Sequence, residues 1–312
     1  MQNSIHTILG ATGAVGQAVI KTLQQKELPL RSVSRKATSE LPNHFQADLL
    51  NKSDTQRAIE GSAFVYLCVG LPYTIKVWER DWELIMENVI EACATHNAKL
   101  IFLDNIYMYA PPLPVPFDED TPQGPTSKKG KVRKRVADKL MQAMEQGAVK
   151  GLIARAADFY GEGAVNSIFY VSFLERILKG KNPQLLSKGD VQHTFANVTD
   201  IGRALVMLAL CEECYGEVWH LPVGEPITME EILSITNKQL GTQYKISVLP
   251  NLLKKILPMF IPIIGEALEM QYQFEQEYVM SFQKFQQKFP EFKLTSYEEG
   301  IAQMITWMKK TT

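Results

Sequence analysis

The chain has 312 residues, of which 46% are hydrophobic and 21% are charged, and its formal net charge is −1. This composition is typical of a globular protein with one large or two smaller domains, and it excludes low-complexity and repeat proteins. Because the charge is close to neutral, the chain as a whole is not attracted to nucleic acid, and we expect no nucleic-acid partner.

The first half of the chain alternates short apolar runs with helical patterns. The apolar runs predict strands at residues 5–10, 29–35, 44–49, 63–70, 99–105 and 151–156. Helical periodicity lies between them, at 14–26, from about 53 to 61, at 75–96 and at 128–146. This order predicts a Rossmann-type α/β fold: a doubly wound parallel sheet with right-handed crossovers and helices on both faces.

After residue 160 the rhythm changes. Helical patterns at 165–179 and 200–211 alternate with short extended pieces such as 217–221, and the tail from 250 is mostly helical in pattern. We therefore predict a smaller, mostly helical C-terminal substrate domain beside the sheet's carboxyl edge, where open α/β sheets bind ligands. The predicted dinucleotide-binding domain comprises 1–158 and 196–224, and the substrate-binding or lid domain comprises 159–195 and 225–312.

Targeting and metal signals are weak. The start, MQNSIHTILG, lacks the pattern of a signal peptide, and the apolar run at 257–264 is short and interrupted by prolines. Cys211 and Cys214 form a CxxC, but a single pair without flanking ligands is a weak zinc or redox signal. We expect a cytoplasmic protein with no membrane partner and no metal.

A glycine motif lies between the first predicted strand and the first predicted helix. Gly10 would allow a tight turn, Gly13 would let the backbone approach a pyrophosphate, and Gly16 would let the helix pack on the strand. The helix N-terminus then offers N–H groups to phosphates. The candidate dinucleotide contacts of this motif are Gly10, Thr12, Gly13, Ala14, Val15 and Gly16.

The end of the second predicted strand indicates which nucleotide is bound. An acidic residue about 20 positions after the glycines would bind the ribose of NAD, but Ser34, Arg35 and Lys36 stand there instead. A guanidinium can bind a 2′-phosphate with several donors, which favours NADP(H) over NAD(H) as the cofactor. The alternative is a pair of solvated surface cations. Further candidate cofactor contacts are Asp48, Leu49, Val69 and Gly70.

Several motifs together resemble the extended and atypical short-chain dehydrogenase/reductase family, in its NAD(P)-dependent epimerase/dehydratase branch. They are GATGAVG at 10–16, EDTP at 119–122, RAADFYG at 155–161 and FANVTD at 195–200, and the resemblance covers about residues 5–221. It implies an oxidoreductase or isomerase that acts on a small carbonyl, hydroxyl or sugar-type substrate with a Ser/Tyr/Lys set.

That catalytic set is altered in this sequence. Asn105 stands where the resemblance expects Ser, and ungapped counting places Lys129 and Arg133 at the Tyr and Lys. A shifted alignment places Ser127 and Lys131 there, so the phenol is absent either way. Residues four apart share a helix face, so Lys129 and Arg133 can face one ligand. Arg133 could hold the ribose, whereas Lys129 could exchange a proton if its surroundings favour the neutral amine.

Other residues are candidates by the same resemblance. Tyr107, Tyr109 and Asp158 are further candidate proton carriers, and Tyr107 and Asp158 join Asn105, Lys129 and Arg133 as the candidate catalytic residues. The candidate substrate contacts are Tyr73, Tyr109 and His193. The alternative for Tyr107 and Tyr109 is packing at the sheet end with a satisfied hydroxyl group. His193 stands where sugar-nucleotide enzymes of the family often have Arg, and its alternative is a surface histidine near a strand.

The sequence thus predicts an NADP(H)-dependent enzyme with an altered active site. The alternative is a non-catalytic, NADP(H)-binding redox sensor on the same fold. The missing tyrosine supports this alternative. The basic run at 125–135 is a weaker candidate for nucleic-acid binding, and Lys134 and Arg135 could instead meet acidic residues of the 75–96 helix. The resemblance also suggests a homodimer formed through the helices at 75–96 and 128–146.

Overall fold

A computed structural model describes residues 4–311. The chain divides into two compact units, which are described separately. The first unit comprises residues 4–111, 122–156 and 199–221, and the second comprises 112–121, 157–198 and 222–311. The sequence predicts boundaries after residues 158, 195 and 224 between a dinucleotide-binding domain and a substrate-binding domain. These boundaries remain a prediction.

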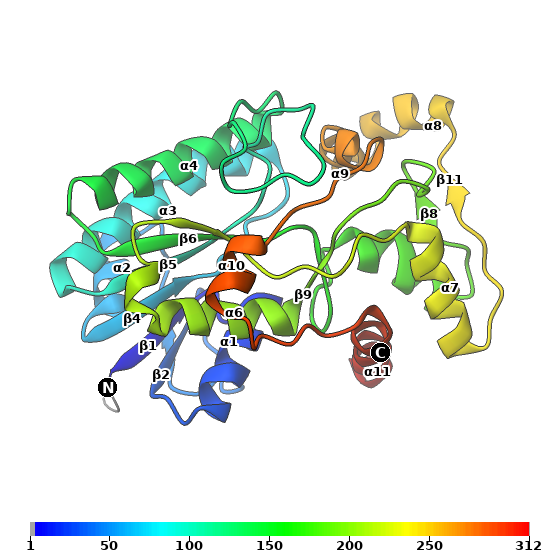
Figure 1. Cartoon of the computed structure of the whole chain (residues 1–312). Helices are drawn as coiled ribbons and strands as arrows, with labels where there is room; N and C mark the ends of the chain where they lie inside the picture. Colours follow the sequence, from blue (N-terminus) through cyan, green and yellow to red (C-terminus); the bar gives the residue numbers. More distant parts are fainter. Residues whose placement is uncertain (1–3, 312) are drawn as a thin grey trace. The chain divides into compact units, whose positions relative to one another are not determined.

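The first unit is built on a seven-stranded sheet in the order β10-β6-β5-β4-β1-β2-β3, with parallel pairing throughout (Figure 1). Its strands are β1 Ile5–Leu9, β2 Leu30–Ser34, β3 His44–Gln46, β4 Ser62–Leu67, β5 Lys99–Asp104, β6 Gly151–Arg155 and β10 Val218–His220. The predicted parallel α/β fold is confirmed.

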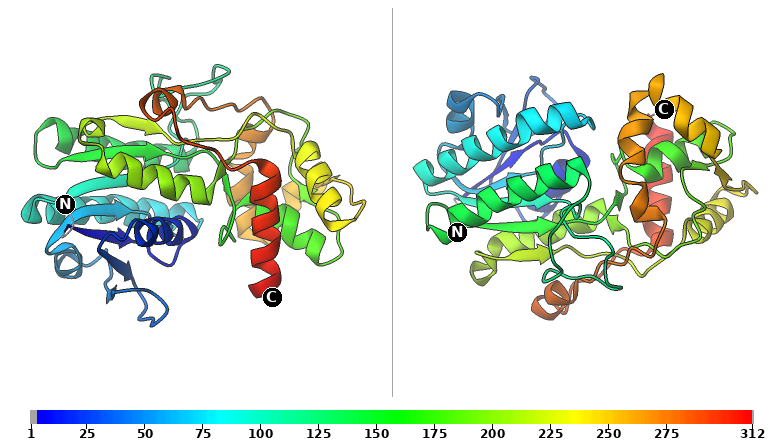
Figure 2. Two further views of the ribbon diagram at one scale, coloured as in Figure 1. Left: turned by 60° about the horizontal axis from the view of Figure 1, so that its bottom comes forward. Right: turned by 90° about the horizontal axis from the view of Figure 1, so that it is seen from above.

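Helices cover both faces of this sheet, as Figures 1 and 2 show. On one face lie α2 (Lys52–Ile59), α3 (Ile75–His96) and α4 (Lys128–Glu145). Their apolar sides form one continuous core with the strands, because long apolar strands buried on both faces require a helix layer on each. On the other face lie α1 (Ala14–Gln25) and α6 (Val198–Leu210).

Two local features fix the ends of the helices on the α3–α4 face. The long helix α3 ends at Asn97, which adopts the left-handed conformation with φ of 53°. Helix α4 begins after Ser127, whose hydroxyl oxygen accepts a hydrogen bond from the Gly130 N–H at 3.0 Å. Among residues 4–311, the structure contains no helix that is both long and apolar enough to cross a bilayer.

The second unit has short strands and many short helices. Two small parallel sheets pair β7 (Phe159–Tyr160) with β9 (Ala196–Asn197), and β8 (Gln184–Leu185) with β11 (Ser247–Val248). The helix predicted at 165–179 is a π-helical turn, η1, followed by α5. The remaining elements are η1 Phe169–Leu174, α5 Glu175–Leu178, α7 Met229–Leu240, α8 Asn251–Ile256, η3 Leu257–Met259, α9 Pro262–Leu268, η4 Gln271–Phe274, α10 Gln283–Lys288 and α11 Tyr297–Thr311.

Candidate functional site

The glycine motif forms a tight turn at the carboxyl end of β1. Gly10 has φ of +89°, a conformation that favours glycine, and the N–H groups of Gly10 and Ala11 donate to the Val33 carbonyl at 3.1 and 3.0 Å. A Cβ on Gly16 would lie 2.4 Å from the Gly10 carbonyl oxygen. Only glycine therefore lets α1 start this close to β1.

The start of α1 leaves backbone donors open at the turn. Gly13 is the N-cap residue and has no side-chain cap, and Thr12 and Gly13 are exposed. Val15 is buried, and Ala14 is half-buried. Because the first N–H groups of a helix have no partner within it, this start can donate to a phosphate group. The residues present therefore fit a dinucleotide, whose nicotinamide would supply or accept hydride when bound.

Gly16→Ala is expected to weaken dinucleotide binding by about tenfold or more, because the added methyl group must push α1 away from the turn. Isothermal titration with NADPH measures the change. Ala18→Gly changes a residue of the same helix, two positions after Gly16. It is the matched control and should keep the affinity for NADPH. Wild-type affinity in the Gly16→Ala variant would contradict the packing argument.

The end of β2 lies beside the glycine turn, because Val33 accepts the hydrogen bonds of that turn. Arg35 and Lys36 are exposed there. Ser34 is buried, and its hydroxyl donates to the Lys36 carbonyl at 2.8 Å and lies 2.9 Å from His44 Nε2. Ser34 thus shapes the strand end, while the two cations are presented to solvent.

The other predicted cofactor residues lie at neighbouring strand ends of the first unit. Asp48 is exposed and accepts a hydrogen bond from the Leu50 N–H at 3.1 Å. Leu49 is buried, and its carbonyl accepts from Asn88 Nδ2 at 2.8 Å. Val69 and Gly70 follow β4, and the Val69 backbone passes close to Gly10, since a Cβ on Gly10 would lie 2.9 Å from Val69 Cα. All four remain predicted cofactor contacts.

The N-terminus of α4 is held against the loop after β5. A Cβ on Gly130 would lie 2.3 Å from the Tyr107 carbonyl oxygen, so only glycine allows this approach. Lys129, the residue before it, is fully buried, and its Nζ lies 4.9 Å from the centroid of the Tyr73 ring. A cation over an aromatic face is a favourable contact, and it fixes the Lys129 side chain in this conformation.

Arg133, one turn further along α4, is bound to the end of β5. Its Nε donates to Asp104 Oδ1 at 2.7 Å, its Nη2 donates to the same oxygen, and both side chains are buried. The guanidinium carbon also lies 4.2 Å from the ring centroid of Trp82 and 5.0 Å from that of Phe102. In this conformation Arg133 is an interior ion-pair partner, whereas the sequence suggested a contact to the cofactor ribose.

The same carboxylate has a second cationic neighbour. Arg155 Nε lies 3.7 Å from Asp104 Oδ2, and Arg155 Nη1 donates to the Tyr109 hydroxyl at 2.8 Å. That hydroxyl also hydrogen-bonds His220 Nε2. The side chains of Asp104, Tyr109, Arg155 and His220 are almost wholly buried. We call Asp104, Arg133, Arg155, Tyr109 and His220 the buried network. For Tyr109, this hydroxyl pairing is the packing alternative rather than an exposed substrate contact.

Sequence reasoning did not find three members of the buried network: Asp104, Arg155 and His220. The signal was present, because Asp104 and Arg155 end two apolar strands that are neighbours in a parallel sheet. Charged residues at the ends of such strands are rarely buried without a partner.

Asn105 and Tyr107 form the turn after β5. Asn105 Oδ1 accepts from the Tyr107 N–H at 3.2 Å, and Asp104 Oδ1 accepts from the Asn105 N–H at 2.8 Å. The Tyr107 ring stacks on Trp78 with centroids 6.4 Å apart, and Trp78 meets Tyr73 edge-on at 5.5 Å. These aromatic contacts place Tyr73, Tyr107 and the Lys129 amine in one cluster of the first unit.

Two predicted residues belong to the second unit and form a pair there. His193 Nε2 lies 3.2 Å from Asp158 Oδ2, with 2% of the His193 side chain exposed against 23% for Asp158. The imidazole stacks on Phe274 and Tyr278, with centroids 4.8 and 5.3 Å away. His193 is therefore a buried residue, and Asp158 is the more accessible member of the pair.

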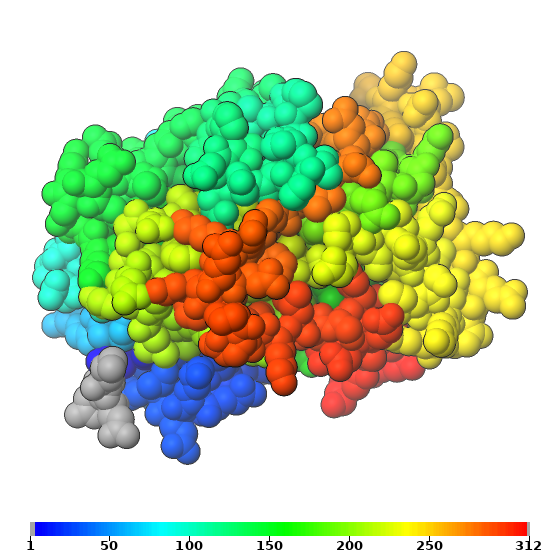
Figure 3. Space-filling model, viewed as in Figure 1, coloured from blue at the N-terminus to red at the C-terminus, as the bar shows by residue number. Residues whose placement is uncertain are grey.

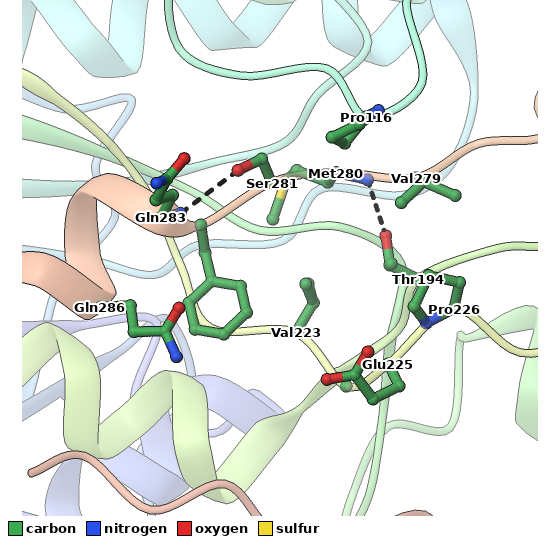
Figure 4. A pocket seen from close by; sticks show the side chains of 12 residues that line it. Pro116, Thr194, Val223, Glu225, Pro226, Val279, Met280, Ser281, Gln283 and Gln286 are labelled. Atoms are coloured by element: carbon green, nitrogen blue, oxygen red, sulfur yellow. Dashed lines mark hydrogen bonds between the residues drawn. The ribbon is translucent and has the colours of Figure 1, made fainter. Parts of the chain in front are cut away.

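A pocket of about 300 Å³ also lies within the second unit (Figure 4). Thr194, Glu225 and Gln286 provide polar groups in its lining, and the Thr194 hydroxyl accepts from the Met280 N–H at 3.0 Å. None of its lining residues is a candidate site residue from the sequence.

The outer side of the basic run is neutralised by neighbouring acids. Arg135 Nε lies 2.6 Å from Glu83 on α3, as expected for a contact with that helix. Lys134 instead pairs with Asp138 on its own helix at 2.8 Å, and Lys139 pairs with Glu87 at 2.7 Å. Three of the six basic residues at 125–135, namely Arg133, Lys134 and Arg135, are therefore paired with acids.

A parallel sheet whose first βα turn is glycine-rich and whose first helix presents free N–H groups defines a Rossmann-type dinucleotide-binding protein. The comparison with protein families then identifies the branch. The model of the NAD dependent epimerase/dehydratase family matches residues 6–217, and the chain belongs to this family, which confirms the resemblance seen in the sequence.

Individual relatives are distant. A dTDP-6-deoxy-L-talose 4-dehydrogenase (NAD(P)(+)) from Kitasatospora kifunensis is 22% identical over 259 residues, covering 78% of this chain and 81% of the relative. A UDP-glucuronic acid 4-epimerase from Bacillus cereus in complex with NAD superposes with a TM-score of 0.81 at 15% identity, covering 98% and 99% of the two chains. A UDP-glucose 4-epimerase from Thermus thermophilus, also with NAD, gives 0.77 at 18% identity over 99% and 100%. At these identities the structures show the shared fold alone.

Proposed function

We propose that the protein is an NADP(H)-dependent oxidoreductase or epimerase-like enzyme acting on a small carbonyl, hydroxyl or sugar-type substrate. The observation that carries the cofactor preference is the end of β2, where exposed Arg35 and Lys36 stand beside the glycine turn. A guanidinium there can bind a 2′-phosphate with charge-assisted hydrogen bonds. The names of the related proteins support NAD(P) as the cofactor class, with both NAD and NAD(P) among them.

Lys129 is the residue that we propose as proton carrier. It takes the position where the family resemblance expects tyrosine, and in this conformation the Tyr73 ring covers its amine. An amine can donate and accept a proton, whereas the guanidinium of Arg133 cannot release one at ordinary pH. Tyr73 must therefore turn aside, or itself contact the substrate, before the Lys129 amine can meet a reacting oxygen.

Asn105 is proposed to orient the substrate oxygen. Its Oδ1 is used by the Tyr107 N–H, so the side-chain amide hydrogens are the groups it can offer. Tyr107 and Asp158 remain candidate proton carriers. Tyr109 and His193 are proposed to act from buried positions, by holding Arg155 and Asp158 respectively, rather than by touching the substrate.

Arg35→Ala is expected to weaken NADPH binding by about 30-fold, because the 2′-phosphate would lose a charge-assisted partner worth about 2 kcal/mol. NADH binding should stay within about twofold, since NADH has no such phosphate. Titration of both cofactors against both proteins measures the effect. Lys26→Ala removes an exposed cation at the other end of α1 and should change neither affinity. Equal losses for NADPH and NADH would contradict the proposed cofactor preference.

The second candidate function is a non-catalytic NADP(H) sensor. The fully buried Lys129 and the ion-paired Arg133 favour it, because both replacements for the usual Tyr and Lys are engaged inside the first unit. Incubation of the NADPH-bound protein with small ketones and sugar nucleotides separates the two candidates. Oxidation of NADPH supports the enzyme, whereas tight NADPH binding without turnover of any compound supports the sensor.

A further inference from the structure

Three successive elements of the second unit, α8, η3 and α9, contain no buried residue. Their sequence, NLLKKILPMFIPIIGEAL at 251–268, is nevertheless strongly apolar. The large apolar side chains exposed along it are Leu252, Leu253, Ile256, Met259, Phe260, Ile261 and Ile263. We call this the apolar segment, and its first part forms the gold spheres at the upper right of Figure 3.

The exposure in this segment is unusual in extent. Met259 is 79% exposed, Phe260 is 75% exposed and Leu252 is 68% exposed. Single exposed apolar side chains are ordinary, but a contiguous group of them marks a surface that another body covers. Pro258 and Pro262 interrupt the helices within the segment, so it cannot form one long amphipathic helix that turns its apolar side inward.

The charged residues of the apolar segment indicate what kind of surface could cover it. Within the apolar segment the charged residues are Lys254, Lys255 and Glu266, so the segment has an excess of one positive charge. Within the described part of the chain, neither lysine side chain has an ion-pair or hydrogen-bond partner, and the Lys254 backbone N–H donates to the Pro250 carbonyl. In contrast, Lys134 and Lys139 on α4 both have acidic partners. The apolar segment therefore combines exposed apolar side chains with uncompensated positive charge.

We propose that the apolar segment binds an anionic lipid surface, with Met259 and Phe260 entering the boundary between headgroups and acyl chains. Lys254 and Lys255 would then contact the anionic headgroups. This is the pattern of segments that lie in a membrane interface: apolar side chains on one side and lysines beside them. Such attachment needs no spanning helix, and it would replace the expectation from the sequence that the protein has no membrane partner.

A second copy of the chain is the less favourable occupant. In a symmetric dimer formed through the apolar segment, the same patch meets itself. The four lysines of the two copies would then share only the two Glu266 carboxylates, one from each copy, and this excess of positive charge opposes association. The lipid surface satisfies both the apolar and the charged groups.

Co-sedimentation of the purified full-length chain with vesicles tests this proposal. Vesicles of phosphatidylcholine alone are compared with vesicles that also contain phosphatidylserine, and binding is expected to the second kind. Lys254→Gln/Lys255→Gln should lower the partition coefficient by about 25-fold, since each lysine near an anionic surface contributes about fivefold. Met259→Ser/Phe260→Ser should lower it by about tenfold or more.

The control variant is Leu84→Ser/Leu210→Ser, which removes two exposed leucines of the first unit. It should bind vesicles like the wild type. Absence of binding to anionic vesicles would overturn the proposal, as would an equal loss in the control. Sedimentation without vesicles tests whether a second copy of the chain binds the apolar segment. If the wild type is a dimer that Met259→Ser/Phe260→Ser dissociates, the segment is a dimer interface and the lipid proposal is overturned. Because the substituted residues are exposed, apart from the half-buried Lys254, thermal unfolding should be unchanged in all variants.

Discussion

Asp104→Ala is expected to lower the free energy of unfolding by about 3–5 kcal/mol, because it leaves two buried guanidinium groups without their carboxylate. Arg133 would lose the hydrogen bonds that its Nε and Nη2 donate to Asp104 and would keep only the 3.3 Å bond of Nη2 to the Leu103 carbonyl, and Arg155 would lose its charged neighbour. Neither side chain can reach water without movement of α4 or β6, since both are almost wholly buried. Urea unfolding followed by circular dichroism measures the loss.

The matched control is Asp138→Ala, which removes the acidic partner of Lys134 on the exposed side of the same helix. An exposed pair of this kind contributes about 0–1 kcal/mol. In addition, Asp104→Ala/Arg133→Met should be more stable than Asp104→Ala alone, because one of the two uncompensated charges is gone. If Asp104→Ala unfolds at the same urea concentration as the wild type, the buried network does not hold α4 to the sheet.

Lys129→Met is expected to lower turnover by about 10²–10⁴-fold, the range that a positioned proton carrier contributes. Methionine keeps an apolar stem of similar length, and it can still contact the Tyr73 ring through its sulfur, but it carries no proton. Loss of NADPH absorbance with the best substrate of the carbonyl and sugar-nucleotide panel gives the rate. The affinity for NADPH should change little.

Two further variants separate proton transfer from packing. Lys129→Arg keeps the cation over Tyr73 but cannot release a proton at working pH, so it should be nearly as inactive as Lys129→Met. Lys131→Met changes an exposed lysine of the same helix and should be fully active. Unchanged turnover in Lys129→Met would show that Lys129 is not the proton carrier, and Tyr107 and Asp158 would then be the remaining candidates.

Much of the fold could be predicted from local sequence. The limits of α3 agree with the helical periodicity at 75–96, and β5 and β6 agree with the apolar runs that end near Asp104 and Arg155. Such patterns repeat within a few residues, so the sequence carries them directly. The glycine turn could be predicted for the same reason, because its steric requirement depends on the chain next to it.

The chemistry of the site depends on contacts between residues far apart in sequence. Helical spacing correctly places Lys129 and Arg133 on the same side of α4, but it does not say that this side meets the Tyr73 ring and Asp104. The stacking of His193 on Tyr278 likewise joins residues that no local pattern relates. For this reason the elements were predictable from the sequence, whereas the partners of their charged side chains were not.

Arg133 also makes position 133 dependent on position 104. A lysine at 133 would present one compact ammonium in place of a planar fork that binds Asp104 and stacks on Trp82. A lysine introduced at position 133 would therefore give Asp104 fewer hydrogen bonds than Arg133 does. The two positions should therefore be coupled: the cost of replacing Arg133 depends on whether Asp104 is present, and a double-mutant cycle measures this dependence.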